Sequence, residues 1–219
     1  MKPSIDPGLK KKCPSVALGC VTARVHTGDS TLELLAEMDL CEAGILKNAD
    51  PRAILEAPAI SATRAGYRAL GKDPARYRGS AEALLRRIIS GKHFPSINCV
   101  VDIINLVSVE SRLPIGLYDL AKVQGDIVFR VGRSGETYKG IGKFDLNLED
   151  LPVFCDVAGP HGSPTSDSER TMVTSSTESV AAILVSFGGP QPLEVWCRRM
   201  TGLMERYTEG RELRTEVVT

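Results

Sequence analysis

The most apolar stretch of the chain, residues 97–109 (INCVVDIINLVSV), predicts a helix that carries a polar stripe. Its aliphatic residues fall on all sides, which is typical of a helix buried all round. Four polar residues recur at spacings that place them on one helical face: Asn98, Asp102, Asn105 and Ser108. Buried polar groups cost free energy unless they are hydrogen-bonded, so we expect the stripe to meet partners or to line a cavity. Asp102 fits either a site or a structural tie to the neighbouring turn.

The pattern before this stretch predicts one strand and then several helices. Residues 14–25 are rich in small and β-branched side chains, as is typical of a strand. Ser30 and Glu33 have the spacing of a capping box, which predicts that Ser30 opens a helix running to about Lys47. Apolar periodicity with flanking prolines and glycines predicts three further helices, in the segments 51–57, 61–72 and 80–91.

The pattern after residue 109 predicts mostly strands. Residues 125–131 (GDIVFRV) alternate like a strand at a sheet edge, and residues 136–142 are expected to return as the second half of a hairpin. Two more strands and an amphipathic helix are predicted in the segments 151–157, 180–187 and 190–209. The last nine residues are expected to form a frayed tail. Helices thus precede most of the strands, which favours an α+β fold.

The most polar and irregular segment is residues 158–171 (AGPHGSPTSDSERT), between two predicted strands. Its glycines and prolines fix a backbone that can present N–H groups to a ligand. Loops that leave the end of a strand are where binding residues usually gather. The same composition also suits a solvated connector held by Asx and Ser/Thr turns, so both interpretations stay open. His161 and the nearby serines and aspartates have the residue types of a serine triad, but loops rich in Ser, Asp and His are common, so the composition alone is weak support for a triad.

Composition indicates a globular chain with an ordinary core, because 42% of the residues are hydrophobic. The 27 basic and 27 acidic residues cancel, which argues against a protein that coats nucleic acid through bulk charge. The charges are unevenly distributed, however. Residues 61–93 carry Asp73 and Glu82 against eight cations: Arg64, Arg68, Lys72, Arg76, Arg78, Arg86, Arg87 and Lys92. This segment is either a patch that faces phosphates or a solvated helical face.

Several kinds of site have no support in the sequence. The six cysteines form no C-x-x-C pair and the three histidines are scattered, so we expect no metal site. The phosphate-loop, nucleophile-elbow and complete dinucleotide motifs are absent, so we expect no cofactor. No apolar stretch has the length of a membrane helix, and the basic start lacks the apolar region of a signal peptide. We therefore expect a cytoplasmic protein.

Residues 97–131, INCVVDIINLVSVESRLPIGLYDLAKVQGDIVFRV, resemble the editing (tRNA-binding) domain in the β subunit of bacterial phenylalanyl-tRNA synthetase. The pattern of that family is an Asn-Pro-Val-Val-Asp-Val-Thr-Asn helix, a Pro-Met-His-Ala-Phe-Asp turn, and then Asp-Lys, Gly and a Val-Arg strand. Seven residues fall in register with it without a gap: Asp102, Asn105, Pro114, Asp119, Lys122, Gly125 and Arg130. The resemblance continues more loosely to Phe187.

The resemblance implies an α+β fold with a layered β-sandwich core flanked by helices. It implies a single editing-domain-like unit over residues 1–219. Within it we expect a mostly helical lead-in at 14–93, a helix plus β core at 97–187 and a C-terminal helix at 190–209. In the synthetase, this domain hydrolyses the ester of tyrosine that is wrongly attached to phenylalanine tRNA, because a pocket discriminates poorly against a competitor that merely adds a group.

The sequence departs from the family at the pocket. The synthetase pocket uses a threonine beside an asparagine, a histidine in the turn and a glutamate on the last strand. Asn105 is retained, but those three positions hold Ile104, Gly116 and Ile183. A pocket that recognises tyrosine is therefore expected to be dismantled or rebuilt.

From the resemblance we expect a freestanding relative that hydrolyses a mischarged aminoacyl-tRNA ester in trans, without the other modules needed to charge tRNA. The implied pocket residues are Asn105, Gly116, Gly162, Ser163, Thr165 and Ser168, and the candidates for holding the catalytic water are Asp102 and Asp167. The cations expected to contact tRNA phosphates are Arg64, Arg68, Arg76, Arg86 and Arg87. The alternatives are a non-catalytic binding module for an amino acid or small metabolite, and a tRNA-binding accessory protein. We expect neither DNA nor a membrane as a partner, and the oligomeric state stays open.

Overall fold

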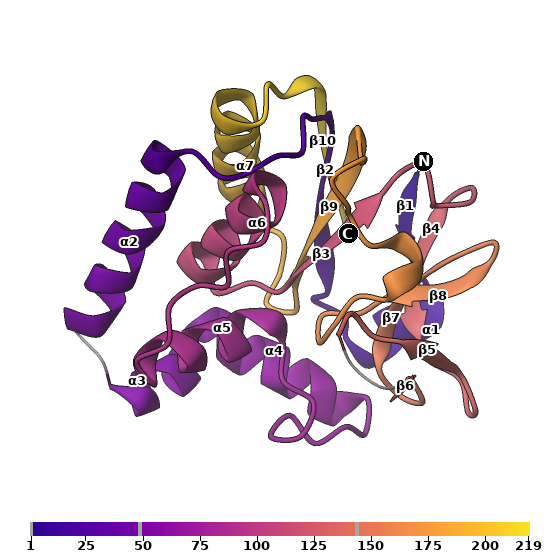
Figure 1. Cartoon of the computed structure of the whole chain (residues 1–219). Helices are drawn as coiled ribbons and strands as arrows, with labels where there is room; N and C mark the ends of the chain where they lie inside the picture. Colours follow the sequence, from indigo (N-terminus) through magenta and orange to yellow (C-terminus); the bar gives the residue numbers. More distant parts are fainter. Residues whose placement is uncertain (1, 48–49, 143–144) are drawn as a thin grey trace.

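The chain folds into a layer of helices and two stacked β-sheets (Figure 1). The computed structural model describes residues 2–47, 50–142 and 145–219. The central sheet has the strand order β10 (Arg211–Val218), β2 (Ala17–Arg24), β9 (Ser179–Ser186) and β3 (Ile115–Asp119). The outer sheet has the order β1 (Pro3–Ile5), β4 (Ile127–Val131), β7 (Pro152–Asp156) and β8 (Gly159–Gly162). The predicted α+β fold, with a layered β-sandwich core flanked by helices, is confirmed.

Strands β2, β9 and β3 of the central sheet are buried on both faces, because they lie between the helices and the outer sheet. Strand β9 shows this in its sequence, since successive side chains point to opposite faces. Ala182 and Leu184 join the core shared with the helices, whereas Ile183 and Val185 join the core shared with the outer sheet. A strand covered on both sides reads as a continuous apolar run, which explains why its position was predicted correctly.

The helical layer is built around α6 (Cys99–Ser111), which packs against neighbouring helices. Its aliphatic residues are buried on all sides, as the sequence predicts. The other helices of this layer are α2 (Leu32–Lys47), α3 (Pro51–Glu56), α4 (Pro58–Ala69), α5 (Ser80–Ile89) and α7 (Leu193–Tyr207). Across the described part of the chain, no helix is long and apolar enough to span a membrane.

The outer sheet encloses a second core that is rich in aromatic rings. Phe129 and Phe154 stack with their ring centroids 4.3 Å apart, and Tyr118 of β3 lies 5.7 Å from the Phe154 ring. Short elements surround this core: α1 (Pro7–Lys12), β5 (Thr137–Lys139), β6 (Asp145–Asn147) and the 3-10 helix η1 (Glu169–Thr171).

The predicted hairpin between residues 125–131 and 136–142 is wrong. Strand β4 pairs in parallel with β1 and antiparallel with β7, while β5 pairs with β6. The reason lies at Gly132, where a Cβ atom would stand 1.9 Å from the Leu148 carbonyl oxygen. That close approach of two backbone segments diverts the chain after β4, so the return strand arrives only at β7.

Two other predictions are corrected by long-range contacts. The last residues are not a frayed tail, because β10 pairs antiparallel with β2 along the edge of the central sheet. Helix α2 begins at Leu32, and its first turn is capped by Thr31, whose Oγ1 accepts a hydrogen bond from the Leu34 N–H at 3.3 Å. Ser30 instead donates its hydroxyl to Asp102 at 2.6 Å, so the predicted capping box on Ser30 does not form.

Candidate functional site

Asp102 ties three segments of the chain together. Its carboxylate is fully buried and accepts hydrogen bonds from the Ser30 hydroxyl (2.6 Å), the Ser96 hydroxyl (3.1 Å) and the Ile97 N–H (3.0 Å). All three donors lie in the segments that lead into α2 and α6. Within the described residues, none of its hydrogen-bond partners comes from the loop that follows β8. This geometry is that of a structural tie.

The remaining residues of the polar stripe also meet protein partners. Asn98 caps α6, since its Oδ1 accepts a hydrogen bond from the Val101 N–H at 3.0 Å. Ser108 donates to the Leu113 carbonyl at 2.8 Å and so holds the chain after the helix. Asn105 is half-buried on α6. The stripe therefore fastens the two ends of α6, and within the described part of the chain Asn105 is its one member without a fastening role.

A second cluster forms where β3 meets the loop of residues 162–168. The Asp167 carboxylate accepts hydrogen bonds from the Tyr118 hydroxyl (3.1 Å) and the Leu117 N–H (3.0 Å), so it is fixed against β3. A Cβ atom on Gly116 would lie 2.1 Å from the Tyr118 hydroxyl oxygen, and one on Gly162 would lie 2.2 Å from it. The Tyr118 phenol therefore fills the space that these two glycines leave open.

Tyr118 was missed from the sequence, although a signal for it exists. Residues two apart on a strand share a face, so a strand through Gly116 places the Tyr118 side chain over the glycine. The segment was interpreted as a turn, which hid this relationship. Gly116 also pairs in register with Ile183 of β9. Gly116 and Ile183, two positions where the sequence departs from the family's pocket, are thus neighbours on adjacent strands, next to the buried Tyr118.

The hydroxyl side chains of the 162–168 loop hold the loop in shape. Ser163 Oγ accepts a hydrogen bond from the Tyr138 hydroxyl at 3.0 Å. The Thr165 hydroxyl is 2.7 Å from the Tyr67 hydroxyl of α4. Ser168 caps η1 by accepting a hydrogen bond from the backbone at 3.2 Å. The structure thus brings Gly116, Gly162 and Asp167 together with these three hydroxyl residues.

The 162–168 loop is also joined to the helical layer. Besides the contact between Thr165 and Tyr67, the Ser80 N–H at the start of α5 donates to the Pro164 carbonyl at 2.7 Å. Both contacts connect segments more than eighty residues apart in the chain. The loop is therefore clamped to α4 and α5, the two helices that carry the cationic segment.

His161 does not form a serine triad. It is fully buried, and burial lowers its pKa to about 4, so its ring is neutral at pH 7. Its ring stands edge-on to Tyr118, with the centroids 4.5 Å apart. Its Nε2 has no hydrogen-bond partner in the part of the chain that is described. Ser163 and Ser168 are hydrogen-bonded elsewhere, so neither is activated by this histidine.

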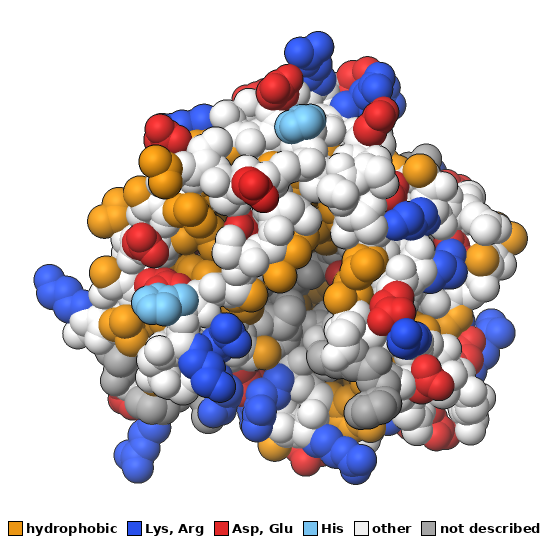
Figure 2. Space-filling model, viewed as in Figure 1, with side chains coloured by type: hydrophobic (Ala, Val, Ile, Leu, Met, Phe, Trp, Pro, Cys, Tyr) orange, Lys and Arg blue, Asp and Glu red, His pale blue; other side chains and the backbone are white. Residues whose placement is uncertain are grey.

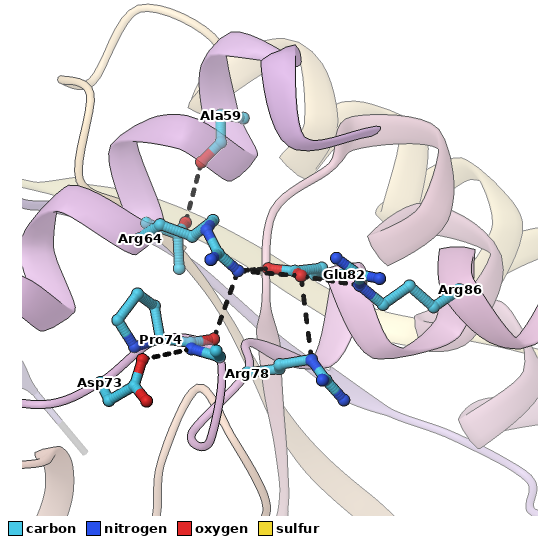
Figure 3. Close-up of polar contacts among 9 residues, drawn as sticks. Ala59, Arg64, Asp73, Pro74, Arg78, Glu82 and Arg86 are labelled. Carbon is cyan, nitrogen blue, oxygen red and sulfur yellow. Dashed lines mark hydrogen bonds and ion pairs between the residues drawn. The ribbon is translucent and has the colours of Figure 1, made fainter. Parts of the chain in front are cut away.

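Three of the eight cations in residues 61–93 gather around one buried carboxylate (Figure 3). The Glu82 side chain is 3% exposed. Arg64 Nη1 lies 3.0 Å from both of its oxygens, Arg86 Nε donates to it at 2.8 Å, and Arg78 Nε is 4.0 Å away. Three guanidinium groups thus share a single negative charge, which leaves this group with two net positive charges.

The other cations of this segment extend the same surface. The Lys72 ammonium and the Arg76 guanidinium lie over the Tyr77 ring, at 4.7 and 5.7 Å from its centroid. Arg68 is exposed on α4, and Arg87 Nε donates to the His93 carbonyl at 2.6 Å. Lys and Arg side chains gather at the lower part of the molecular face in Figure 2, over α4 and α5. We call the following set the arginine surface: Arg64, Arg68, Lys72, Arg76, Arg78, Arg86 and Arg87.

The described residues form no metal site, and the cavity described below lies away from the arginine surface and the 162–168 loop. Among the described residues no group of three His, Cys, Asp or Glu side chains is arranged to hold a metal ion. A cavity of about 550 Å³ opens between the sheets beside β2 and β10, where Thr22 and Arg214 line it. It contains no residue of the arginine surface or of the 162–168 loop.

Comparison with known proteins identifies relatives over much of the chain. The family model for the B3/4 domain matches residues 62–190, more than half of the 219 residues, and this range includes the arginine surface and the 162–168 loop. The phenylalanine–tRNA ligase β subunit of Bradyrhizobium diazoefficiens is 31% identical over 84 residues, which are 38% of this chain and 10% of that subunit. The corresponding subunit of Paramagnetospirillum magneticum is 38% identical over 65 residues, which are 29% of this chain and 8% of that subunit.

A solved structure shares the fold. An N-terminal fragment of the phenylalanyl-tRNA synthetase β subunit from Pyrococcus horikoshii superposes with a TM-score of 0.54 and 14% identity. The superposition covers 100% of this chain and 51% of that one. The chain matches only about a tenth of the length of the curated relatives, so their complete activity does not transfer with the similarity.

Proposed function

Because this chain belongs to the B3/4 domain family, we propose that it binds tRNA and that the RNA lies across the arginine surface of α4 and α5. The observation that carries the proposal is the arrangement around Glu82, where three arginines share one buried carboxylate. Guanidinium groups match phosphate geometry, and phosphate contacts dominate the affinity of most RNA-binding surfaces. The relatives named as tRNA ligase subunits support tRNA as the RNA partner.

The neutral net charge of the chain does not oppose this proposal, because the charges are segregated. A solvated helical face usually pairs its cations with exposed acids one turn away. Here Arg78 and Arg86 share Glu82, which is buried, and Arg68 and Arg76 have no acidic partner among the described residues. The surface therefore presents an excess of cations locally, within a screening length of about 8 Å at physiological salt.

The test measures binding of unfractionated tRNA as a function of salt. Each phosphate contact contributes about 0.7 to 0.9 to the slope of log affinity against log salt, so several contacts produce a steep decline. Arg68→Gln, on the surface, is expected to lower the affinity several-fold and the slope by about 1. Arg211→Gln, on β10, is the matched control and is expected to change neither. Weak binding without salt dependence, or equal losses in both variants, would contradict the proposal.

Hydrolysis of a mischarged aminoacyl-tRNA in trans is the second candidate. It is favoured by the convergence of Gly116, Gly162 and Asp167 at one place, clamped to the arginine-bearing helices. In this reaction Asp167 orients a water and Asn105 positions the substrate. Water adds to the ester carbonyl carbon, the bond to the ribose oxygen breaks, and the amino acid and tRNA leave. Tyr118 limits how deeply the amino acid enters.

A deacylation panel separates this activity from binding alone. Purified protein is offered tRNAs charged with correct and incorrect amino acids, and release of each amino acid is compared with the spontaneous rate. Asp167→Asn is expected to slow the release at least tenfold, whereas Asp145→Asn, an exposed change on β6, leaves it unchanged. Salt-sensitive tRNA binding without any release would identify an accessory tRNA-binding protein. In either role we propose that the protein acts in the cytoplasm, where tRNA is used.

A further inference from the structure

We propose that Glu82 is a positioning residue of the RNA-binding surface and that its negative charge strengthens the binding of tRNA. The carboxylate holds Arg64, Arg78 and Arg86 in one arrangement, whose remaining N–H groups bind phosphate oxygens. This inference rests on the tRNA binding proposed above. It adds an acidic residue to a site whose other members are cations.

The burial of the four side chains indicates the division of roles. Glu82 is 3% exposed and Arg64 is 17% exposed, whereas Arg86 and Arg78 are 38% and 47% exposed. Arg86 uses Nε to bind the carboxylate, and its two terminal nitrogens have no hydrogen-bond partner among the described residues. Figure 3 shows the arginines reaching Glu82 from different sides. The carboxylate forms the base of the cluster, and the two outer guanidinium groups face solvent.

The base of the cluster is itself held firmly. Glu82 lies in the first turn of α5, where the helix dipole favours a negative charge. Arg64 also donates to the Pro74 carbonyl, which fastens the loop between α4 and α5 to the same group. A guanidinium fixed before binding loses less side-chain freedom when it meets a phosphate. Held arginines therefore bind phosphate more tightly than equally charged arginines that move independently.

If summed charge alone determined RNA affinity, removing the Glu82 carboxylate would change the affinity in the opposite direction. If only the sum of charges matters, Glu82 repels phosphate and cancels one arginine, so removing its charge strengthens RNA binding. If Glu82 positions the arginines, removing it weakens RNA binding even though the surface becomes more positive. The sign of the change separates the two views.

The experiment measures tRNA affinity at several salt concentrations for Glu82→Gln and Glu82→Asp. Glu82→Gln removes one negative charge from the surface, and Glu82→Asp keeps the charge but shortens the side chain by one methylene. We expect both variants to bind about tenfold more weakly, because the arginines lose their shared anchor. Unchanged or tighter tRNA binding by Glu82→Gln would overturn the inference.

Two further variants keep the result interpretable. Glu205→Gln removes a negative charge in the same way on α7, a helix at the opposite end of the molecule from α4 and α5 in Figure 1, and is expected to leave tRNA affinity unchanged. Arg64→Lys conserves charge but removes the two-oxygen contact with Glu82, so it decides the question if the Glu82 variants fail to fold. It is expected to weaken binding several-fold, and unchanged affinity would reject the inference.

The outcome for the wild-type protein separates the inference from the function on which it rests. Absence of salt-dependent tRNA binding by the wild-type protein would reject the proposed function and the inference together. Steep salt-dependent binding by the wild-type protein, with tighter binding by Glu82→Gln, would reject the positioning role alone. In that case the arginine surface would still bind RNA, and its affinity would depend on the sum of its charges.

Discussion

At the scale of single residues, the chain places polar groups where water cannot reach them and satisfies most of them with hydrogen bonds to other parts of the protein. Asp102 and Ser108 lie in an apolar helix: Ser108 is hydrogen-bonded to the segment that follows the helix, and Asp102 to the segment that precedes it and to the distant Ser30. The polar stripe predicted that partners must exist. The stripe did not predict which residues these partners are, because Ser30, a donor to Asp102, is seventy-two residues away in the sequence. Two buried side-chain atoms have no hydrogen-bond partner among the described residues, Ser80 Oγ and His161 Nε2, and His161 is the exception that can be protonated.

This exception predicts a pH dependence of stability. Burial lowers the pKa of His161 from 6.5 to about 4, so the unfolded chain binds a proton between these pH values and the folded chain does not. The free energy of unfolding should therefore fall as the pH drops from 6.5 to 4, by about 3 kcal/mol from this residue. Urea unfolding at pH 7, 5.5 and 4 measures the decline.

The matched variants for this prediction are His161→Phe and His26→Gln. Phenylalanine keeps an aromatic ring beside Tyr118 and cannot be protonated, so it should remove most of the decline between pH 6.5 and 4. His26 is exposed, and its replacement should leave the decline in place. An equally steep decline in His161→Phe would show that other groups cause it.

At the scale of elements, sequence patterns located those elements whose burial is uniform. Helix α6 and strand β9 were both predicted, because one is apolar all round and the other is apolar on both faces. Strand β10 was missed because its residues are mostly exposed and charged. Only its pairing with β2 and the packing of Leu213 and Val217 against the core make it a strand, and neither is visible in the local sequence.

Strand β10 is therefore expected to contribute to stability. Deleting residues 211–219 removes its pairing with β2 and the partly buried Leu213 and Val217, which should lower the free energy of unfolding by about 3 kcal/mol. Chemical unfolding of the shortened protein tests this. Arg214→Gln, which changes an exposed side chain and keeps the strand, serves as the control. An unchanged midpoint after deletion would mean that β10 is dispensable.

At the scale of the whole molecule, two cores share the central sheet. One core lies against the helices and the other against the outer sheet, and β2, β3 and β9 contribute side chains to both. The layered fold followed from the resemblance, and the order of helices before strands agreed with it. The sheet order did not follow from the sequence, because β1 and β4 pair across more than one hundred residues.

The shared sheet predicts that the chain unfolds in one step. Trp196, the single tryptophan, lies on α7 in the helical layer, whereas Tyr67, Tyr118 and Tyr138 belong to the core of the outer sheet. Tryptophan fluorescence and tyrosine near-UV absorbance should therefore give the same midpoint in urea. Two separated midpoints would instead show that the helical layer and the sandwich are independent folding units.

If the protein binds RNA as proposed, the clamp between the 162–168 loop and the helices couples that binding to any ligand of the loop. Ser80 and Tyr67 join this loop to the elements that carry the arginine surface. If RNA on those helices stabilises one arrangement of the loop, any ligand that prefers the same arrangement binds more tightly when RNA is present. Thermodynamic linkage then requires the reverse: that ligand raises the affinity for RNA by the same factor. Two hydrogen bonds would thus make the protein a sensor of what its RNA carries.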